Sequence, residues 1–343
     1  MPITRRSFLA TTAAATGALA LSGPVRAEPD IVLGQGDFKY RVVKDWGVLD
    51  AETPVKNCHG IVIDKAGNII LFTDHVKNNV IVYDKKGKLV SKWGTTFPGA
   101  HGLSIVTEGE KEVLYLTDLN THKVYKSTLD GKILNEWAWP EATGKYTKEA
   151  EYKPSWTLHL ADGSFFILDG YGKDYIQHIG ADGKFIKIFG GAEGGITHWG
   201  PHGGMADLRD ANNPTLLIGM SDQQYILRLG LDGKKLDQTP MPGGNPRQIR
   251  LHKDRFFVAH LGDDWPKNKE SHGFLSVLDK DLKVLSNIGG TPPVYDDKGV
   301  LQPMKHQEEV FMHPHDLFVD DDESIYVAQF LSKNTYPIKL ERV

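Results

Sequence analysis

The stretch CHGIVID at Cys58–Asp64 is the first of six similar phrases along this chain of 343 residues. Each phrase opens a short apolar segment, and a polar turn and a second apolar segment follow it. The lead residues of the six phrases are His59, His101, Ser155, His202, Arg247 and His315. Repeats of roughly 40 to 50 residues that contain only strands are typical of a β-propeller, whose blades surround a central channel. The lead residues are therefore predicted to meet at that channel.

The first unit predicts a blade of four strands, over residues 59–64, 69–73, 80–83 and 89–94. Turns that contain glycine or aspartate separate these segments, as in tight hairpins. The run IILFT at 69–73 is almost continuously apolar, which favours a strand buried on both faces between neighbouring blades. We predict an all-β protein with one domain, a six-bladed β-propeller over residues 28–343.

The last unit predicts only three strands, over 315–319, 324–329 and 336–343. The missing outer strand is found at the other end of the chain, where YRVVKDWG at 40–47 resembles the blade ending SKWG at 91–94. Pairing of this N-terminal strand with the last three would close the ring.

The first 27 residues are interpreted as a twin-arginine signal peptide rather than as part of the fold. TRRSFL at 4–9 precedes a mildly apolar run, and VRA at 25–27 is a small-residue cleavage site. The apolar run is too short to anchor the protein in a membrane. We expect a periplasmic or secreted protein that begins near Glu28.

Charge and cysteine content exclude several classes of partner and cross-link. Beyond residue 27 the chain carries 37 basic and 44 acidic residues, a net charge of −7. An acidic body argues against binding to nucleic acid or to an anionic membrane. Cys58 is the only cysteine, so no intramolecular disulfide can form. We expect a small-molecule or peptide-derived substrate, and the sequence identifies no protein partner.

His101, His202 and His315 share one register in the second, fourth and sixth units. Alternate blades of a six-bladed ring stand about 120° apart, so three neutral imidazoles could bind one cation and leave positions open for substrate. Zinc is the expected ion. His59 has the same register in an odd unit and could be a fourth ligand, a hydrogen-bonding neighbour or a substrate contact; we assign it to substrate binding.

Three further residues have both a structural and a functional interpretation. An arginine in the channel, Arg247, needs either an anionic substrate or a structural ion pair. Tyr171, between two glycines, could face the channel or be an ordinary turn aromatic. Asp316 directly follows His315 and could be a strand cap or a ligand for a hard cation such as calcium.

HGLS at 101–104, DGY at 169–171 with GKF at 183–185, and PHDL at 314–317 together resemble the signatures of the peptidyl-α-hydroxyglycine α-amidating lyases. These are six-bladed propellers of the NHL-repeat type, and the resemblance covers essentially all of residues 28–343. The activity it implies is cleavage of the N–C bond of a carbinolamide, with release of an amide and glyoxylate.

The resemblance also implies roles for individual residues. His101, His202 and His315 would bind zinc, and Tyr171 would be the base that takes the proton of the substrate hydroxyl. A structural calcium ion would be held by the Asp316 carboxylate and the backbone carbonyls of Ile61 and Leu103.

Two arginines of the family's active site have no counterpart here. Asp74 stands at the position of the first and Ser221 near the second, while Arg247 matches a family arginine. We expect Asp74 to contact the substrate, and Arg247 to act with Tyr171 in catalysis. The loss of positive charge keeps two alternatives open. One is a metal-dependent hydrolase of an ester or lactone, and the other is a non-catalytic propeller that binds a ligand or a protein.

Overall fold

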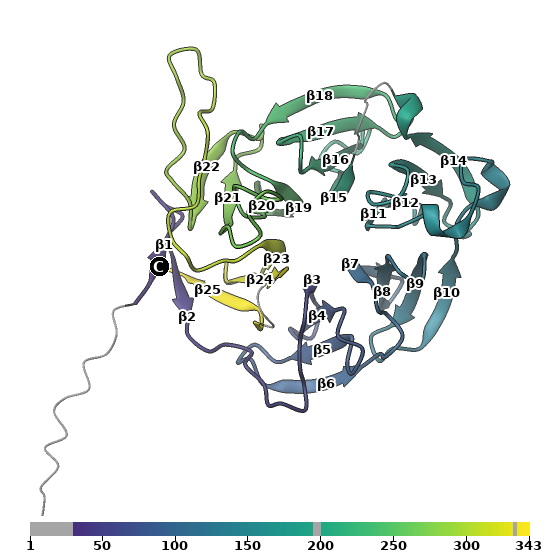
Figure 1. Cartoon of the computed structure of the whole chain (residues 1–343), viewed down its shortest axis with the longest axis horizontal. Coiled ribbons are helices and arrows are strands. Elements are labelled where there is room, and N and C mark those ends of the chain that lie inside the picture. The colour runs from purple at the N-terminus through teal and green to yellow at the C-terminus, as the bar shows by residue number, and fades with distance from the viewer. Residues whose placement is uncertain (1–29, 195–199, 332–334) are drawn as a thin grey trace, which may run out of the picture. The chain divides into compact units, whose positions relative to one another are not determined.

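Six antiparallel sheets surround a central axis in the unit Ile31–Val343 (Figure 1). This computed structural model describes residues 30–194, 200–331 and 335–343. The predicted signal peptide, residues 1–27, lies outside the described residues. Strands β3, β7, β11, β15, β19 and β23 lie nearest the axis (Figure 1). The all-β, six-bladed propeller predicted from the sequence is confirmed.

The strands have the following bounds. The first blade has β3 (Cys58–Ile63), β4 (Ile69–Thr73), β5 (Val80–Tyr83) and β6 (Leu89–Trp93). The second has β7 (Ala100–Glu108), β8 (Lys111–Asp118), β9 (Lys123–Thr128) and β10 (Ile133–Trp137). The third has β11 (Trp156–His159), β12 (Phe165–Leu168), β13 (Tyr175–Ile179) and β14 (Phe185–Gly190). The fourth has β15 (Pro201–Asp207), β16 (Thr215–Met220), β17 (Tyr225–Gly230) and β18 (Lys235–Pro240). The fifth has β19 (Pro246–His252), β20 (Arg255–His260), β21 (Phe274–Leu278) and β22 (Val284–Ile288).

The sixth blade joins the two ends of the chain. It contains β23 (Pro314–Val319), β24 (Ile325–Gln329), β25 (Ile338–Arg342), β2 (Tyr40–Val43) and β1 (Val32–Leu33). β2 pairs antiparallel with β25, and Val42 lies opposite Leu340. The predicted closure by the N-terminal strand is thus confirmed. β1 adds a fifth strand that the sequence pattern did not indicate, because two residues are too few to show alternation.

The core consists of apolar layers between adjacent blades. β4 is buried along its whole length, as its continuous apolar run predicted. Ile69 and Leu71 pack in the cluster that includes Tyr326 of the sixth blade. The alternating residues Ile70 and Phe72 pack in the cluster of the second blade. Because each side of the strand meets a different neighbour, apolar side chains are required at successive positions.

Helical structure is sparse in the described part of the chain. Three short 3-10 helices occur, η1 (Glu141–Thr143), η2 (Glu149–Glu151) and η3 (Ala192–Gly194). Within the described ranges no helix has the length and apolar character needed to cross a bilayer.

Replacing Tyr40 tests the closing strand. Tyr40 lies on β2, and its side chain is fully buried in the apolar cluster shared by the fifth and sixth blades. Tyr40→Ala should lower the free energy of unfolding by about 3–5 kcal/mol, as large-to-small core changes do. Val32→Ala, at a side chain of the neighbouring β1 that is half exposed, should stay within about 0.5 kcal/mol. Chemical denaturation measures both, and equal losses would contradict the proposed importance of the β2–β25 seam.

Candidate active site

A local irregularity turns the lead side chains toward the axis. In five innermost strands the pairing register shifts at the lead residue. The shifts lie between Cys58 and Gly60, Ala100 and Leu103, Pro201 and Gly203, Pro246 and Ile249, and Pro314 and Asp316. A β-bulge of this kind re-aims one side chain without breaking the strand. Ser155 lies just before β11 and needs no shift.

The glycine after a lead histidine permits close approach of the inner strands. A Cβ atom at Gly102 would lie only 2.4 Å from the carbonyl oxygen of Ser155 in the next blade. A Cβ atom at Gly60 would lie 2.4 Å from the Cβ of Leu103. The His-Gly pair therefore places an imidazole, which can bind a metal ion, where the backbones of neighbouring blades are very close.

All four lead histidines come together at the axis. The ring centroids of His101, His202 and His315 are 4.7–4.8 Å apart in every pairing. His59 joins them, 4.8 Å from His101 and 4.5 Å from His315. One ring nitrogen from each of His59, His101 and His315 lies within 4.8 Å of the others. Residues far apart in the sequence thus form one cluster.

Backbone carbonyls fix the orientation of three of these rings. The Nδ1 atom of His101 lies 2.8 Å from the oxygen of Ser155, and that of His315 lies 2.8 Å from the oxygen of His59. His59 Nδ1 lies 2.7 Å from the oxygen of Ala100. Carbonyl oxygens only accept, so each Nδ1 carries the proton and each Nε2 keeps a free lone pair. This is the arrangement around metal-bound histidines.

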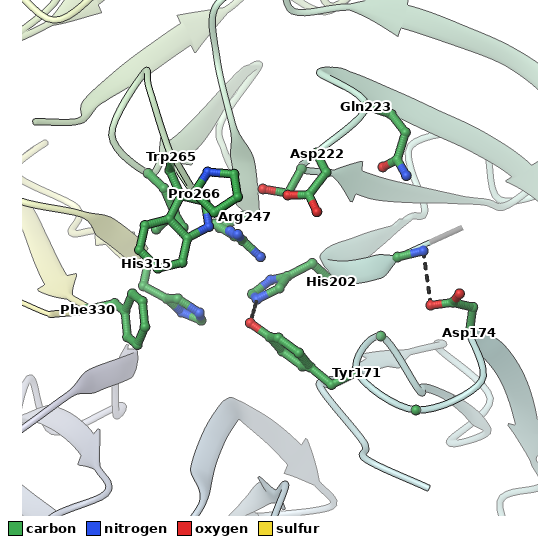
Figure 2. A pocket seen from close by; sticks show the side chains of 15 residues that line it. Tyr171, Asp174, His202, Asp222, Gln223, Arg247, Trp265, Pro266, His315 and Phe330 are labelled. Carbon is green, nitrogen blue, oxygen red and sulfur yellow. Dashed lines mark hydrogen bonds between the residues drawn. The ribbon is translucent and has the colours of Figure 1, made fainter. Parts of the chain in front are cut away.

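The fourth ring is paired with the candidate base. The Tyr171 hydroxyl and the Nε2 atom of His202 are hydrogen-bonded at 2.9 Å (Figure 2). The Nε2 atoms of His101 and His315 and the Nδ1 atom of His202 are buried without a hydrogen-bond partner among the described residues. Buried polar atoms are rarely left unpaired, so these positions fit a ligand that accepts nitrogen lone pairs.

The electrostatics of the cluster favour neutral rings. Burial lowers the pKa of His101, His202 and His315 well below the ordinary value of histidine. The neighbouring imidazoles and Arg247 lower these pKa values further. Neutral imidazole is the form that binds metal, and zinc accepts three such ligands with an open position. The residues therefore fit zinc. By ring centroids the predicted triad is evenly spaced, whereas the nitrogens that lie within 4.8 Å of one another belong to His59, His101 and His315 and not to His202, so His59 is also placed as a ligand.

A tightly anchored loop presents Tyr171. A Cβ atom at Gly170 would lie 2.2 Å from the oxygen of Pro201, so only glycine fits there. The buried Asp169 carboxylate accepts hydrogen bonds from the backbone N–H groups of Lys153 (2.7 Å) and Lys173 (2.8 Å) and from the Tyr146 hydroxyl (2.7 Å). Burial raises the pKa of Asp169 to about 7, and these bonds oppose the shift. No sequence pattern indicated the Tyr146 contact, which joins residues 23 apart.

A cavity of about 430 Å³ lies beside the histidine cluster (Figure 2). Tyr171, His202, His315 and Arg247 line it together with residues of two contrasting walls. One wall is largely apolar and contains Leu261, Trp265, Pro266 and Phe330, and the other contains Ser221, Asp222 and Gln223. The sequence did not single out Trp265 or Phe330, because neither belongs to a repeated phrase.

Arg247 projects into this cavity toward His202 and His315 (Figure 2). It is 6% exposed, and its Nε atom is buried without a hydrogen-bond partner among the described residues. A buried guanidinium with an unused donor fits an incoming anionic group.

Several predicted residues lie elsewhere. Asp74 is not among the described residues that line the cavity. Its carboxylate accepts hydrogen bonds from the backbone N–H (3.0 Å) and the side-chain amide (2.9 Å) of Asn57. His59 does not line the cavity either, but its ring stacks on Phe330 at 5.2 Å. Cys58, next to His59, could in principle offer a thiolate, but it is buried and burial raises the pKa of its thiol to about 12. It is therefore suited to be a small apolar residue of the core.

The three predicted calcium ligands converge, but they surround a side chain. The Nη2 atom of Arg250 lies 2.7 Å from an Asp316 carboxylate oxygen and 3.5 Å from the carbonyl oxygens of Ile61 and Leu103. Arg250 was not predicted from the sequence. It could have been found as a second arginine on an innermost strand, three residues after Arg247. An arginine in such a position requires a buried counter-charge.

Comparison with known proteins supports the fold. A catalytically inactive histidine-to-alanine variant of virginiamycin B lyase from Staphylococcus aureus, solved with quinupristin, is 17% identical (TM-score 0.54; 90% of this chain and 88% of that chain covered). A protein of unknown function from Bacteroides thetaiotaomicron is 14% identical (TM-score 0.56; 87% and 72% covered). At such identities the likeness shows the fold alone. No protein-family model and no curated protein matches the chain.

Removing the Asp169 carboxylate tests the anchoring of the Tyr171 loop. Asp169→Ala should lower the free energy of unfolding by roughly 2–4 kcal/mol, because buried donors lose their acceptor. Asp162→Ala is the matched control, since Asp162 caps an exposed turn of the same blade through Ser164. It should lose less than about 1 kcal/mol. Losses of the same size in urea denaturation would contradict the anchoring role.

Proposed function

We propose that the protein is a zinc-dependent lyase that cleaves the C–N bond of a hydroxylated amide and releases an aldehyde such as glyoxylate. The observation that carries this proposal is the cluster of neutral, buried imidazoles with the Tyr171 hydroxyl 2.9 Å from His202 Nε2. The signatures shared with the amidating lyases support the substrate class. A propeller of similar fold that is named as a lyase supports the reaction class.

His101, His202 and His315 would hold the ion, and Nδ1 hydrogen bonds would keep the rings of His101 and His315 in place. A bound zinc ion would supply the positive charge that lowers the pKa of a nearby hydroxyl and polarises a forming carbonyl. Three protein ligands leave a position open for the substrate.

Tyr171 would act as the base. Tyr171 is 44% exposed as a residue, but its hydroxyl is directed at His202. The loss of solvent there and the nearby Asp222 raise the pKa of the phenol, while Arg247 opposes this shift. The tyrosine would take the proton of the substrate hydroxyl as the C–O bond becomes a carbonyl and the C–N bond breaks. The electron pair goes to the amide nitrogen, which receives the proton back from Tyr171. The products are an amide and an aldehyde, and no oxidant or reductant is required.

Arg247 would bind the carboxylate of the substrate. A guanidinium and a divalent cation in one channel repel each other unless an anion lies between them. A substrate that carries a carboxylate next to its hydroxyl-bearing carbon meets this requirement. The apolar wall of Trp265 and Phe330 would then face the rest of the substrate.

A hydrolase that acts on an ester or lactone is the second candidate. One observation favours it. Arg247 is the only arginine among the described residues that line the cavity. Near the position where the amidating lyases have a second arginine, this chain has Ser221. A neutral substrate does not require a second positively charged side chain.

Zinc binding is the first test. Purified protein should contain about one zinc ion per chain, since the triad would form one three-coordinate site. His101→Ala, His202→Ala and His315→Ala should each weaken zinc binding by about 100-fold or more, because even indirect partners of a metal contribute 10- to 100-fold. His178→Ala is the control, since His178 lies on β13 and its ring stacks on Phe166 of β12. Elemental analysis and competition with a chelator measure these values.

Turnover is the second test. Glyoxylate release from a peptidyl-α-hydroxyglycine should fall by about 10²–10⁴-fold in Tyr171→Phe, the usual contribution of a general base. Zinc content should stay unchanged in this variant, which separates catalysis from metal binding. Parallel assays should include a lactone series and quinupristin. Lactone hydrolysis without glyoxylate release would favour the hydrolase, and an intact, metal-free protein with no turnover would favour a binding platform.

A further inference from the structure

The Asp316 carboxylate is the centre of a second buried polar site on the axis. Its side chain is fully buried on β23. The backbone N–H groups of Ile61 and Leu317 donate to its two oxygens at 2.9 and 2.8 Å. The Arg250 guanidinium donates to the same oxygens through Nε at 3.1 Å and Nη2 at 2.7 Å. The carboxylate therefore has a bidentate partner of opposite charge.

The same guanidinium reaches other blades. Its Nη2 atom lies 3.5 Å from the carbonyl oxygens of Ile61 on β3 and Leu103 on β7. Its Nε atom donates to the carbonyl oxygen of Leu317 at 3.2 Å. The guanidinium carbon also lies 5.7 Å from the centre of the Trp156 ring on β11. One side chain of β19 thus contacts the innermost strands of four other blades.

The oxygen atoms around this guanidinium form a set that would suit a hard cation. Calcium binds carboxylate and carbonyl oxygens, usually six to eight of them at about 2.3–2.6 Å. Here a single positive charge already balances the single carboxylate. A calcium ion at this point would meet N–H donors rather than lone pairs, and like charge. The residues present therefore do not fit a calcium ion while Arg250 is in place.

We propose that Arg250 takes the place of an axial calcium ion, so that the ring is held together by a cation of its own chain. The site expected to need a metal would then be metal-independent. This inference does not depend on the proposed function, because it concerns neither zinc nor the cavity at Tyr171.

A second cavity makes the proposal testable. It has a volume of about 520 Å³, and Arg250, Asp64, Asp320 and Asp321 are among its lining residues. Removal of the Arg250 side chain should therefore let an ion from solution reach the Asp316 carboxylate and the carbonyl oxygens that surround the guanidinium. Lys65 and Lys85 also line this cavity, and Lys85 pairs with Asp320 at 2.6 Å. Without Arg250 the three carboxylates still outnumber the two ammonium groups, which would favour the entry of a cation.

The experiment compares thermal unfolding in EGTA and in about 10 mM CaCl₂, a concentration that saturates sites of millimolar or tighter affinity. The wild-type midpoint should be equal in both. Arg250→Ala should melt on the order of 10 °C lower in EGTA, as expected when one partner of a buried ion pair is removed. Calcium should restore part of this loss, whereas equal MgCl₂ should not, because magnesium is smaller and demands a stricter geometry.

Arg209→Ala is the matched control. Arg209 also forms a bidentate pair, with Asp207 at 2.8 and 2.7 Å, but its side chain is 32% exposed. Arg209→Ala should lose less stability and should not respond to calcium.

Two results would overturn the proposal. One is a wild-type protein that loses stability in EGTA or that contains one calcium ion per chain by elemental analysis. The other is a folded Arg250→Ala protein that melts at the same temperature with and without calcium. If Arg250→Ala fails to fold in either buffer, the wild-type melting curves and calcium content decide the question.

Discussion

The close approach of the innermost strands at the axis is the constraint on which the rest of the structure depends. Six strands can converge only if little side-chain volume lies between them, and Gly102 shows how little space is left. The bulges at five of the six lead residues then direct one larger side chain each into the remaining channel. Ring closure by β2 holds this geometry, because an open ring would let the blades separate.

The axis carries two charged sites of different character, and β19 supplies an arginine to both. Arg247 is buried beside neutral imidazoles, with an unused Nε donor. Arg250, three residues further along, is paired with Asp316. The first arrangement is electrostatically incomplete without an anion, whereas the second is already neutral. On this basis the first is suited to binding a ligand and the second to stabilising the fold.

Repetition made much of the fold and the core of the site predictable. Because the six phrases share one register, His101, His202 and His315 could be placed together without knowing any distance. The apolar run at 69–73 likewise predicted a strand buried on both faces. β1 was missed because local pattern is weak in a two-residue strand.

Contacts outside the repeat were harder to predict. Arg250 and Asp316 are 66 residues apart, and their pairing depends on the stacking of blades. Trp265 and Phe330 reach the cavity from loops, where no periodicity indicates the direction of a side chain. Asp74 was assigned to the substrate from an aligned position, but its carboxylate is engaged by Asn57.

The central claim is that one ion is shared by three imidazoles from alternate blades. Anomalous diffraction from a crystal, recorded on both sides of the zinc absorption edge, tests it most directly. A single strong peak is expected in contact with the Nε2 atoms of His101 and His315 and the Nδ1 atom of His202. No peak at the axis in zinc-supplemented crystals, or a peak bound elsewhere, would contradict it.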